Sequence, residues 1–150
     1  IIQKAVELGV NRIVPVLSRR CISRPDEKDF AKKLDRLNKI AEGAAKQSGR
    51  GIIPEVMPII SYKNAVLQMK ELDSCIILYE NGGKSFDEIE FEGKKSIGIV
   101  IGSEGGFDEQ EVELAVNAGA ESVWLGNRIL RCETAPITAL SILMFLTKNF

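Results

Sequence analysis

Two almost continuous apolar runs, SCIILYE (residues 74–80) and IGIVIG (97–102), constrain the fold of this chain more than any other feature. Runs of this length without alternating polar residues are typical of strands buried on both faces of a parallel sheet. Shorter strands are expected at 12–18, 55–60 and 122–126. Between these strands lie segments of helical periodicity. The sequence therefore predicts an α/β domain with a mostly parallel sheet and helices on both faces.

Helix boundary signals support this alternation. Helices are expected at 1–8, 26–48, 62–72, 109–118 and after residue 133, whereas 81–96 is expected to be a polar connection. Ser61 is expected to cap the third helix. Asp108 and Glu111 have the spacing of a capping box at the start of the fourth. Thr134 is expected to cap the last helix, with Pro136 in its first turn.

Composition excludes several kinds of chemistry. The 150-residue chain contains no histidine, which removes the commonest general base and most transition-metal sites, so no metal is expected. Its three cysteines are far apart and fit a reducing cytoplasm rather than a disulfide framework. With a net charge of −1, the chain as a whole does not attract polyanions. The longest apolar run, ALSILMFL, is well short of the roughly 20 residues that span a bilayer. No membrane association is expected.

The segment IGSEGGFDEQE places a glycine-rich turn between a strand and a helix. Gly102, Gly105 and Gly106 would allow the backbone to approach a ligand closely. We call residues 102–106 the glycine loop. It lacks the lysine of a phosphate-binding loop and carries Glu104, which would repel phosphate but tolerate an adenosyl ligand with an amine and a sulfonium. The alternative is a purely structural turn in which Glu104 accepts bonds from neighbouring amides.

The segment LGNRILRCETA follows the last expected strand. Arg128 and Arg131 offer planar donors for an RNA backbone or a substrate carboxylate. The alternative is a structural network in which both pair with Glu133 or Glu104. Cys132 is interpreted as a packing residue, because the sequence offers no base to activate it as a nucleophile. In parallel sheets, ligands bind where loops leave the C-terminal ends of strands, so the loops after Tyr79, Gly102 and Gly126 are expected to converge.

Two further segments suggest partners. The basic segment from Arg19 to Arg24, which we call the arginine loop, and Arg50 after the long helix are candidates for phosphate contacts or simply solvated surface. The last helix, ITALSILMFLTK, is apolar on nearly every face, so it must be sandwiched. A second copy of the chain could provide part of that cover, which suggests a homodimer.

Four motifs taken in order, QKAVELGVNRIVPVLSRR, AAKQSGRGIIPEV, IGSEGGF and LGNRILRCETA, resemble the ribosomal RNA small subunit methyltransferase E family of the SPOUT class. The resemblance covers essentially the whole chain. It implies S-adenosylmethionine-dependent methylation of N3 of a uridine in 16S rRNA, in the cytoplasm. It further implies a homodimer with a C-terminal trefoil knot. The chain opens on Ile1, and the family's N-terminal PUA-like RNA-binding domain is expected upstream of residues 1–150, which form the methyltransferase domain.

The resemblance implies the loops that contact the cofactor, and on this basis we assign hypothetical roles to the charged residues. Arg128 or Arg131 would stabilise charge on a uridine oxygen, and Glu133 or water would take the proton. Arg19, Arg20, Arg24 and Arg50 would hold RNA phosphates. The cofactor would contact residues of three loops: Leu78, Tyr79, Glu80, Ile101, Gly102, Ser103, Glu104, Gly105, Gly106, Leu125, Gly126, Ile129, Leu130, Thr134 and Ala135.

One position departs from the family, because Ser103 stands where its glycine loop usually has proline. Three other hypotheses predict different behaviour. A nucleotide-binding α/β domain would bind ATP or NAD, but the GxGxxG motif and the phosphate-binding lysine are missing. A sister family that methylates ribose 2′-hydroxyls usually has Asn-Val-Ser where this chain has CETA. A dimerisation or RNA-binding scaffold would fold without binding the cofactor.

Overall fold

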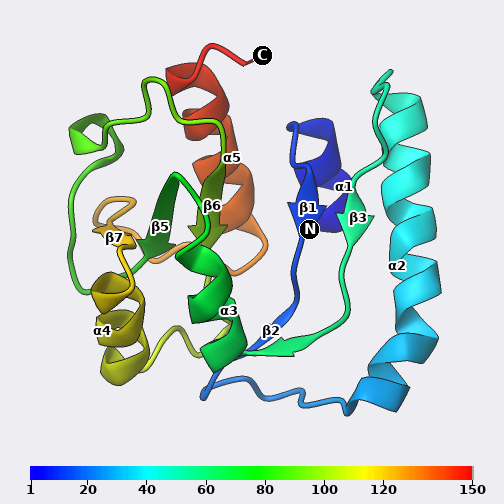
Figure 1. The fold of residues 1–150 in the computed structure, drawn as a ribbon, viewed down its shortest axis with the longest axis horizontal. Helices are drawn as coiled ribbons and strands as arrows, with labels where there is room; N and C mark the ends of the chain where they lie inside the picture. Colours follow the sequence, from blue (N-terminus) through cyan, green and yellow to red (C-terminus); the bar gives the residue numbers. More distant parts are fainter. Residues whose placement is uncertain (150) are drawn as a thin grey trace.

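The computed structural model describes residues 1–149. Seven short strands and five α-helices alternate along this part of the chain, and every strand pair is parallel, as the sequence predicts. β5 (Ser74–Leu78) lies between β6 (Ile97–Val100) and β7 (Glu121–Val123) in a three-stranded sheet. Two smaller pairs join β1 (Arg12–Ile13) to β3 (Glu55–Val56) and β2 (Val16–Leu17) to β4 (Ile60–Ser61). The N-terminal pairs and α2 lie beside the three-stranded sheet rather than over it (Figure 1).

Helices cover both faces of the three-stranded sheet. Cys75 and Ile77 of β5 pack against α3 (Tyr62–Met69) and α4 (Glu109–Asn117). Their neighbours Ile76 and Leu78 pack on the other side against α5 (Thr134–Leu146) and the short 3₁₀ helix η1 (Phe86–Glu88). This alternation is the period of two expected of a strand buried on both faces. The predicted fold class is therefore confirmed in its parallel sheet and two helical layers.

The N-terminal half forms its own small core. α1 (Ile2–Glu7) packs on α2 (Glu27–Gln47), where Val6 meets a row of small residues ending in Ala45. Asn38 of α2 reaches β3 and exchanges two hydrogen bonds with the backbone of Val56, 2.9 and 3.1 Å long. This half is joined to the rest of the chain by α5, which covers the three-stranded sheet: Ala5 of α1 packs with Leu140 and Met144 of α5. α5 is thus sandwiched largely within one chain.

Several boundaries differ from the sequence prediction. The strand expected at 12–18 is two separate strands, because Pro15 interrupts the ladder, and the strand expected at 55–60 is likewise divided around Pro58. β6 is only partly buried, since it lies at the edge of the three-stranded sheet.

The connection 81–96 and the start of α5 also differ from expectation. The connection is not simply polar, since Phe86, Ile89 and Phe91 are buried against β5 and α5. Thr134 does not cap α5. It is the first helical residue, and Glu133 is the N-cap without a side-chain cap bond.

The predicted caps of two helices are confirmed. The Ser61 side chain accepts a hydrogen bond from the backbone N–H of Asn64 at the start of α3. At α4 both halves of the capping box are present, with Asp108 as N-cap and Glu111 reaching back to the Asp108 N–H. Among residues 1–149, no helix combines the length and apolarity needed to cross a membrane.

Candidate ligand pocket

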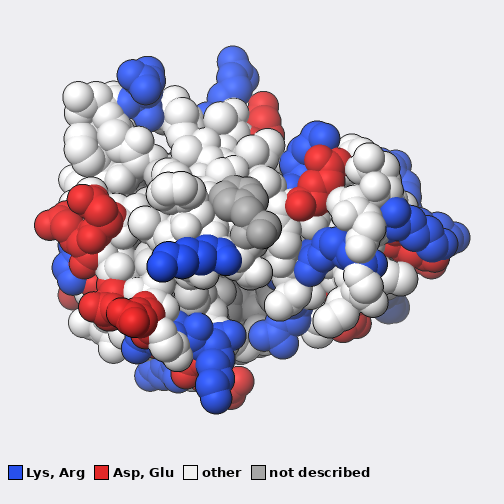
Figure 2. All heavy atoms as spheres, turned by 90° about the horizontal axis from the view of Figure 1, so that it is seen from above, with Lys and Arg blue, Asp and Glu red and all other residues white. Residues whose placement is uncertain are grey.

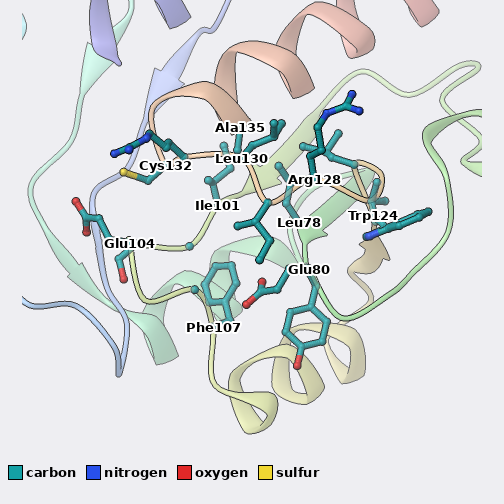
Figure 3. A pocket seen from close by; sticks show the side chains of 18 of the residues that line it. Leu78, Glu80, Ile101, Glu104, Phe107, Trp124, Arg128, Leu130, Cys132 and Ala135 are labelled. Atoms are coloured by element: carbon teal, nitrogen blue, oxygen red, sulfur yellow. The ribbon is translucent and has the colours of Figure 1, made fainter.

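Three segments that directly follow the C-terminal ends of β5, β6 and β7 enclose one cavity of about 650 Å³. Its walls are residues 78–80, 101–107 and 123–133, with Ala135 from the first turn of α5. Figure 3 shows Leu78, Ile101, Leu130 and Ala135 around its centre, with Glu80 and Phe107 below them. Since parallel strands end at the same edge, the three loops expected from the sequence meet there.

The glycine loop forms a wall that has no space for side chains. A Cβ on Gly102 would lie 3.0 Å from the Cα of Gly106, so the two ends of the loop cross in close contact. Gly106 has φ +66°, and its N–H donates to the carbonyl of Ser103 at 2.9 Å. A Cβ there would also lie 2.7 Å from Oε1 of Glu80. The glycines therefore close a tight turn and bring backbone directly to the cavity.

Ser103 carries an unusual group for this wall. Its Oγ is buried and has no hydrogen-bond partner, which holds for no other side-chain nitrogen or oxygen atom of the described residues. A buried unpaired hydroxyl costs folding free energy, because it has lost its water without gaining a protein acceptor. The unpaired Ser103 hydroxyl therefore destabilises the glycine loop.

The charged side chains that line the cavity are Glu80, Glu104, Glu133, Arg128 and Arg131, with no lysine among them. The Cys132 sulfhydryl donates to Oε2 of Glu133 at 3.2 Å. This bond, together with burial and the nearby Glu104, raises the pKa of Cys132 to about 11. The same bond lowers the pKa of Glu133 below its usual range. Cys132 is therefore held as a neutral thiol, and Glu133 is ionised at neutral pH.

Arg128 and Arg131 are both exposed, and neither is within ion-pairing distance of a carboxylate among residues 1–149. The structural network with Glu104 or Glu133 is thus not formed as direct ion pairs. Arg128 extends on the Trp124 side of the cavity, whereas Cys132, next to Arg131, lies near Glu104 on the opposite side (Figure 3). The two arginines leave the loop at different places and remain available to a ligand.

The four arginines expected to hold phosphates lie outside the cavity. Nη1 of Arg50 donates to the carbonyls of Val6 and Val10 and Nη2 to Asn11, so this guanidinium joins α1 to α2. Nη1 of Arg24 donates to the carbonyls of Ser18 and Arg19.

Arg19 and Arg20 contact the glycine loop and the start of α4, and their side chains are exposed. On the face seen in Figure 2, Lys and Arg side chains lie in several separate groups with Asp and Glu beside them.

All but one of the residues expected to contact the cofactor line this cavity, as do the three catalytic candidates. The exception is Thr134, whose side chain is exposed and whose carbonyl accepts from Thr138 Oγ1. Five lining residues were not among the expected site residues: Phe107, Val123, Trp124, Asn127 and Cys132. Phe107 directly follows the glycine loop, which was the available signal. For Trp124, no feature of the sequence indicated a place in the pocket beyond its position at a strand end.

A parallel α/β sheet with a glycine-walled cavity at its C-terminal edge defines a class of ligand-binding domains. The RNA methyltransferase domain family matches residues 1–144, so the chain belongs to that family.

Curated relatives of this chain, among them the following two, carry the name ribosomal RNA small subunit methyltransferase E. The one from Bacillus subtilis is 37% identical over 99% of this chain and 60% of its own length. The one from Mesomycoplasma hyopneumoniae is 41% identical over 93% and 60%. The chain therefore spans about 60% of the length of these relatives.

Solved structures give the same result. A ribosomal RNA small subunit methyltransferase E from Neisseria gonorrhoeae, solved bound to S-adenosyl methionine, is 41% identical and superposes with a TM-score of 0.88 over 97% of this chain and 59% of its own. A putative methyltransferase from Legionella pneumophila, in complex with the same cofactor, is 34% identical with a TM-score of 0.91 over 97% and 59%.

Proposed function

We propose that this chain is the catalytic domain of an S-adenosylmethionine-dependent methyltransferase that acts on N3 of a uridine in 16S rRNA. The observation that carries the proposal is the cavity where three loops of a parallel sheet meet, walled by glycines and acidic side chains and with no lysine in its lining. The family match and the cofactor-bound relatives support the same reading. The nucleotide and the atom come from the resemblance to the methyltransferase E family.

The residues present fit the cofactor. The cavity of about 650 Å³ lies within the usual range of roughly 300–1,000 Å³ for small-molecule sites. Leu78, Ile101 and Leu130 offer apolar surface to an adenine ring, while Glu80 and Glu104 suit the positive amine and sulfonium. The glycine loop presents backbone to the cavity, because a Cβ on Gly102 would meet Gly106 and one on Gly106 would meet the Glu80 carboxylate.

S-adenosylmethionine supplies an electrophilic methyl group, which forms a bond to N3 of uracil as its bond to sulfur breaks. The N3 proton must leave before or as N3 attacks, and its loss places negative charge on the neighbouring carbonyl oxygens until the new N–C bond forms. Arg131 or Arg128, both free of internal partners among residues 1–149, would donate to such an oxygen. Glu133 is ionised and can accept the proton, although its lowered pKa makes it a weak base, so water is the alternative acceptor.

Five further features belong to the proposal. RNA phosphates would contact Arg19 and Arg20, whose exposed guanidiniums have donors to spare. A PUA-like RNA-binding domain would precede this methyltransferase domain, and two copies would form a homodimer. The loops from Gly102 to Gly106 and from Leu125 to Ala135 would form the trefoil knot of the SPOUT class. The cytoplasm, where ribosomal subunits are assembled, would be its location.

Calorimetric titration of the 150-residue chain with S-adenosylmethionine tests the proposal, with ATP and NAD as controls. Saturable binding of S-adenosylmethionine alone, at one site per chain, is expected. Folded protein that binds ATP or NAD instead would support a nucleotide-binding domain. Folded protein that binds none of the three would leave a scaffold role as the better reading of the same fold.

A further inference from the structure

Two residues with polar or charged side chains, Ser18 and Glu111, are almost completely buried: Ser18 directly precedes the arginine loop, and Glu111 of α4 contacts it. The chain after β2 runs along the bottom of Figure 1, beneath the segment that joins β6 to α4. Glu111 is 5% exposed, although a carboxylate is costly to bury. Helix capping alone does not explain the burial of Glu111, because an exposed carboxylate caps a helix equally well.

Glu111 bonds to both segments at once. Its Oε2 accepts from the backbone N–H of Asp108 at 3.1 Å, which completes the capping box of α4. Its Oε1 accepts from the backbone N–H of Arg19 at 2.7 Å, a contact across 92 positions of sequence. One buried carboxylate therefore ties the arginine loop to the residue that follows the glycine loop and Phe107. Charge-assisted bonds of this kind are about twice as strong as neutral ones.

Side chains of the arginine loop extend the same junction. Nη1 of Arg19 donates to Oδ1 of Asp108 (2.8 Å) and to Oε1 of Gln110 (2.9 Å). Nη1 of Arg20 donates to the carbonyl of Gly105 at 3.2 Å. A Cβ on Gly105 would lie 3.0 Å from Cβ of Arg20, so the two loops touch backbone to side chain. The far side of α4 is fixed too, since the Tyr62 hydroxyl donates to the carbonyl of Glu111 at 2.7 Å.

We propose that Glu111 is a positioning residue: by holding Arg19 against the start of α4, it fixes the glycine loop in the form that binds the cofactor and presents Arg19 and Arg20 beside it. This inference rests on the proposed function. Each guanidinium uses only Nη1 for bonds among the described residues, so its Nε and Nη2 donors are free for phosphate. The phosphate contacts and the cofactor wall therefore behave as one rigid unit.

The test replaces Glu111 by Gln, which keeps the size of the side chain but sets an amide N–H₂ against one of the two backbone donors. Amide hydrogen exchange is expected to speed up at least about tenfold at Arg19, with no change at Ile77 in the centre of the sheet. Calorimetry is expected to give a Kd for S-adenosylmethionine raised about tenfold, because the wall must then be ordered on binding. Glu113→Gln, an exposed carboxylate on the same helix, is the matched control and should match the wild type.

Arg19→Ala provides an intermediate case. It removes the bonds to Asp108 and Gln110 but keeps the backbone bond to Glu111, so its Kd for S-adenosylmethionine should rise less than that of Glu111→Gln. If Glu111→Gln melts at a lower temperature but binds S-adenosylmethionine within about twofold of wild type when folded, Glu111 is a helix cap alone and the inference is overturned, while the proposed function stands. If the wild-type chain itself does not bind, the proposed function fails. Unchanged exchange at Arg19 in the Glu111→Gln variant overturns the inference independently of any ligand.

Discussion

Arg131 is the residue on which the proposed chemistry depends most. Its guanidinium has no carboxylate partner among residues 1–149, so Arg131→Ala leaves no buried group unpaired. The free energy of unfolding should therefore change by no more than about 0.5 kcal/mol. Methylation of small ribosomal subunits should fall by about 10²- to 10³-fold, as for the loss of an oxyanion donor. Arg36→Ala, an exposed arginine of α2, is the control.

In this experiment, retained activity in the Arg131→Ala variant would transfer the role to Arg128. Lost activity together with lost folding would instead mean that the arginine is structural. Rate and melting temperature must therefore be measured on the same preparation.

Ser103→Ala should stabilise the unliganded protein. The substitution removes the one buried hydroxyl that lacks a hydrogen-bond partner in the described part of the chain, and it deletes no other heavy atom. A gain of about 1 kcal/mol is expected, which corresponds to a rise in Tm of about 3 °C for a domain of this size. Differential scanning calorimetry measures it. Ser122→Ala is the contrasting case, because Oγ of Ser122 donates to the Gly82 carbonyl at 3.1 Å, and its loss should lower Tm.

Cys132 is partly exposed but should react slowly. Because its pKa is raised to about 11 by the bond to Glu133, almost all of it is thiol at pH 8, and only the thiolate attacks iodoacetamide. Alkylation at pH 8 should be about a hundredfold slower than for a free thiol of ordinary pKa, and should accelerate as the pH rises toward 11. Peptide mass spectrometry measures the rate at this position. Glu133→Gln removes the anion that raises the pKa, so a rate no faster than wild type would contradict the assignment.

At the scale of elements, the connection 81–96 does more than join two strands. The Lys84 N–H donates to the Ser122 carbonyl (2.9 Å), and the Trp124 N–H donates to the Lys84 carbonyl (3.0 Å), so the connection extends the sheet beyond β7. Gly83 makes this approach possible. A Cβ there would lie 2.5 Å from the backbone oxygen of Ser122, and φ is +152°.

Gly83→Ala should therefore destabilise the domain by about 1–3 kcal/mol more than Gly82→Ala does. Both glycines have positive φ, but a Cβ on Gly82 would meet nothing within 4 Å, so the difference between the two isolates the clash with β7. Urea unfolding of both variants measures it. Equal losses would mean that the connection yields without disturbing β7.

These elements mark the limit of what the sequence predicts. Caps depend on neighbouring residues, so the capping box of Asp108 and Glu111 could be read directly. The burial of Phe86, Ile89 and Phe91 could not, because their spacing follows neither a strand nor a helix and their partners lie on β5 and α5.

The pocket, too, could be predicted from the sequence only in part. Strand ends and glycines indicated its three loops. The placing of Phe107 and Trp124 in its wall, and the use of Arg19 and Arg50 to hold segments of the chain together, depend on contacts between distant residues.

At the scale of the whole molecule, α5 bears on the proposed homodimer. The helix buries Ala139 and Leu143 against the sheet and Leu140 and Met144 against α1, but Phe145 near its end is 73% exposed. If a second copy covers this end, Phe145→Asp should weaken dimerisation at least about tenfold. Analytical ultracentrifugation over a range of concentrations measures it. Leu67→Asp, another exposed apolar position on α3, is the control, and an unchanged association constant for Phe145→Asp would place any interface elsewhere.

The order of strands in the sheet has a consequence for how the protein is made. β5 is central, but its two neighbours come later in the chain, and the last wall of the pocket is built from residues 123–135. The opposite wall is held by Arg19, near the start. A chain still emerging from the ribosome can therefore pair β5 with β6, yet it has no complete cavity until residues 123–135 are synthesised. A ligand of this cavity therefore meets its full set of contacts only after residues 123–135 have joined the earlier loops, and a shorter nascent chain would not compete for the same molecule.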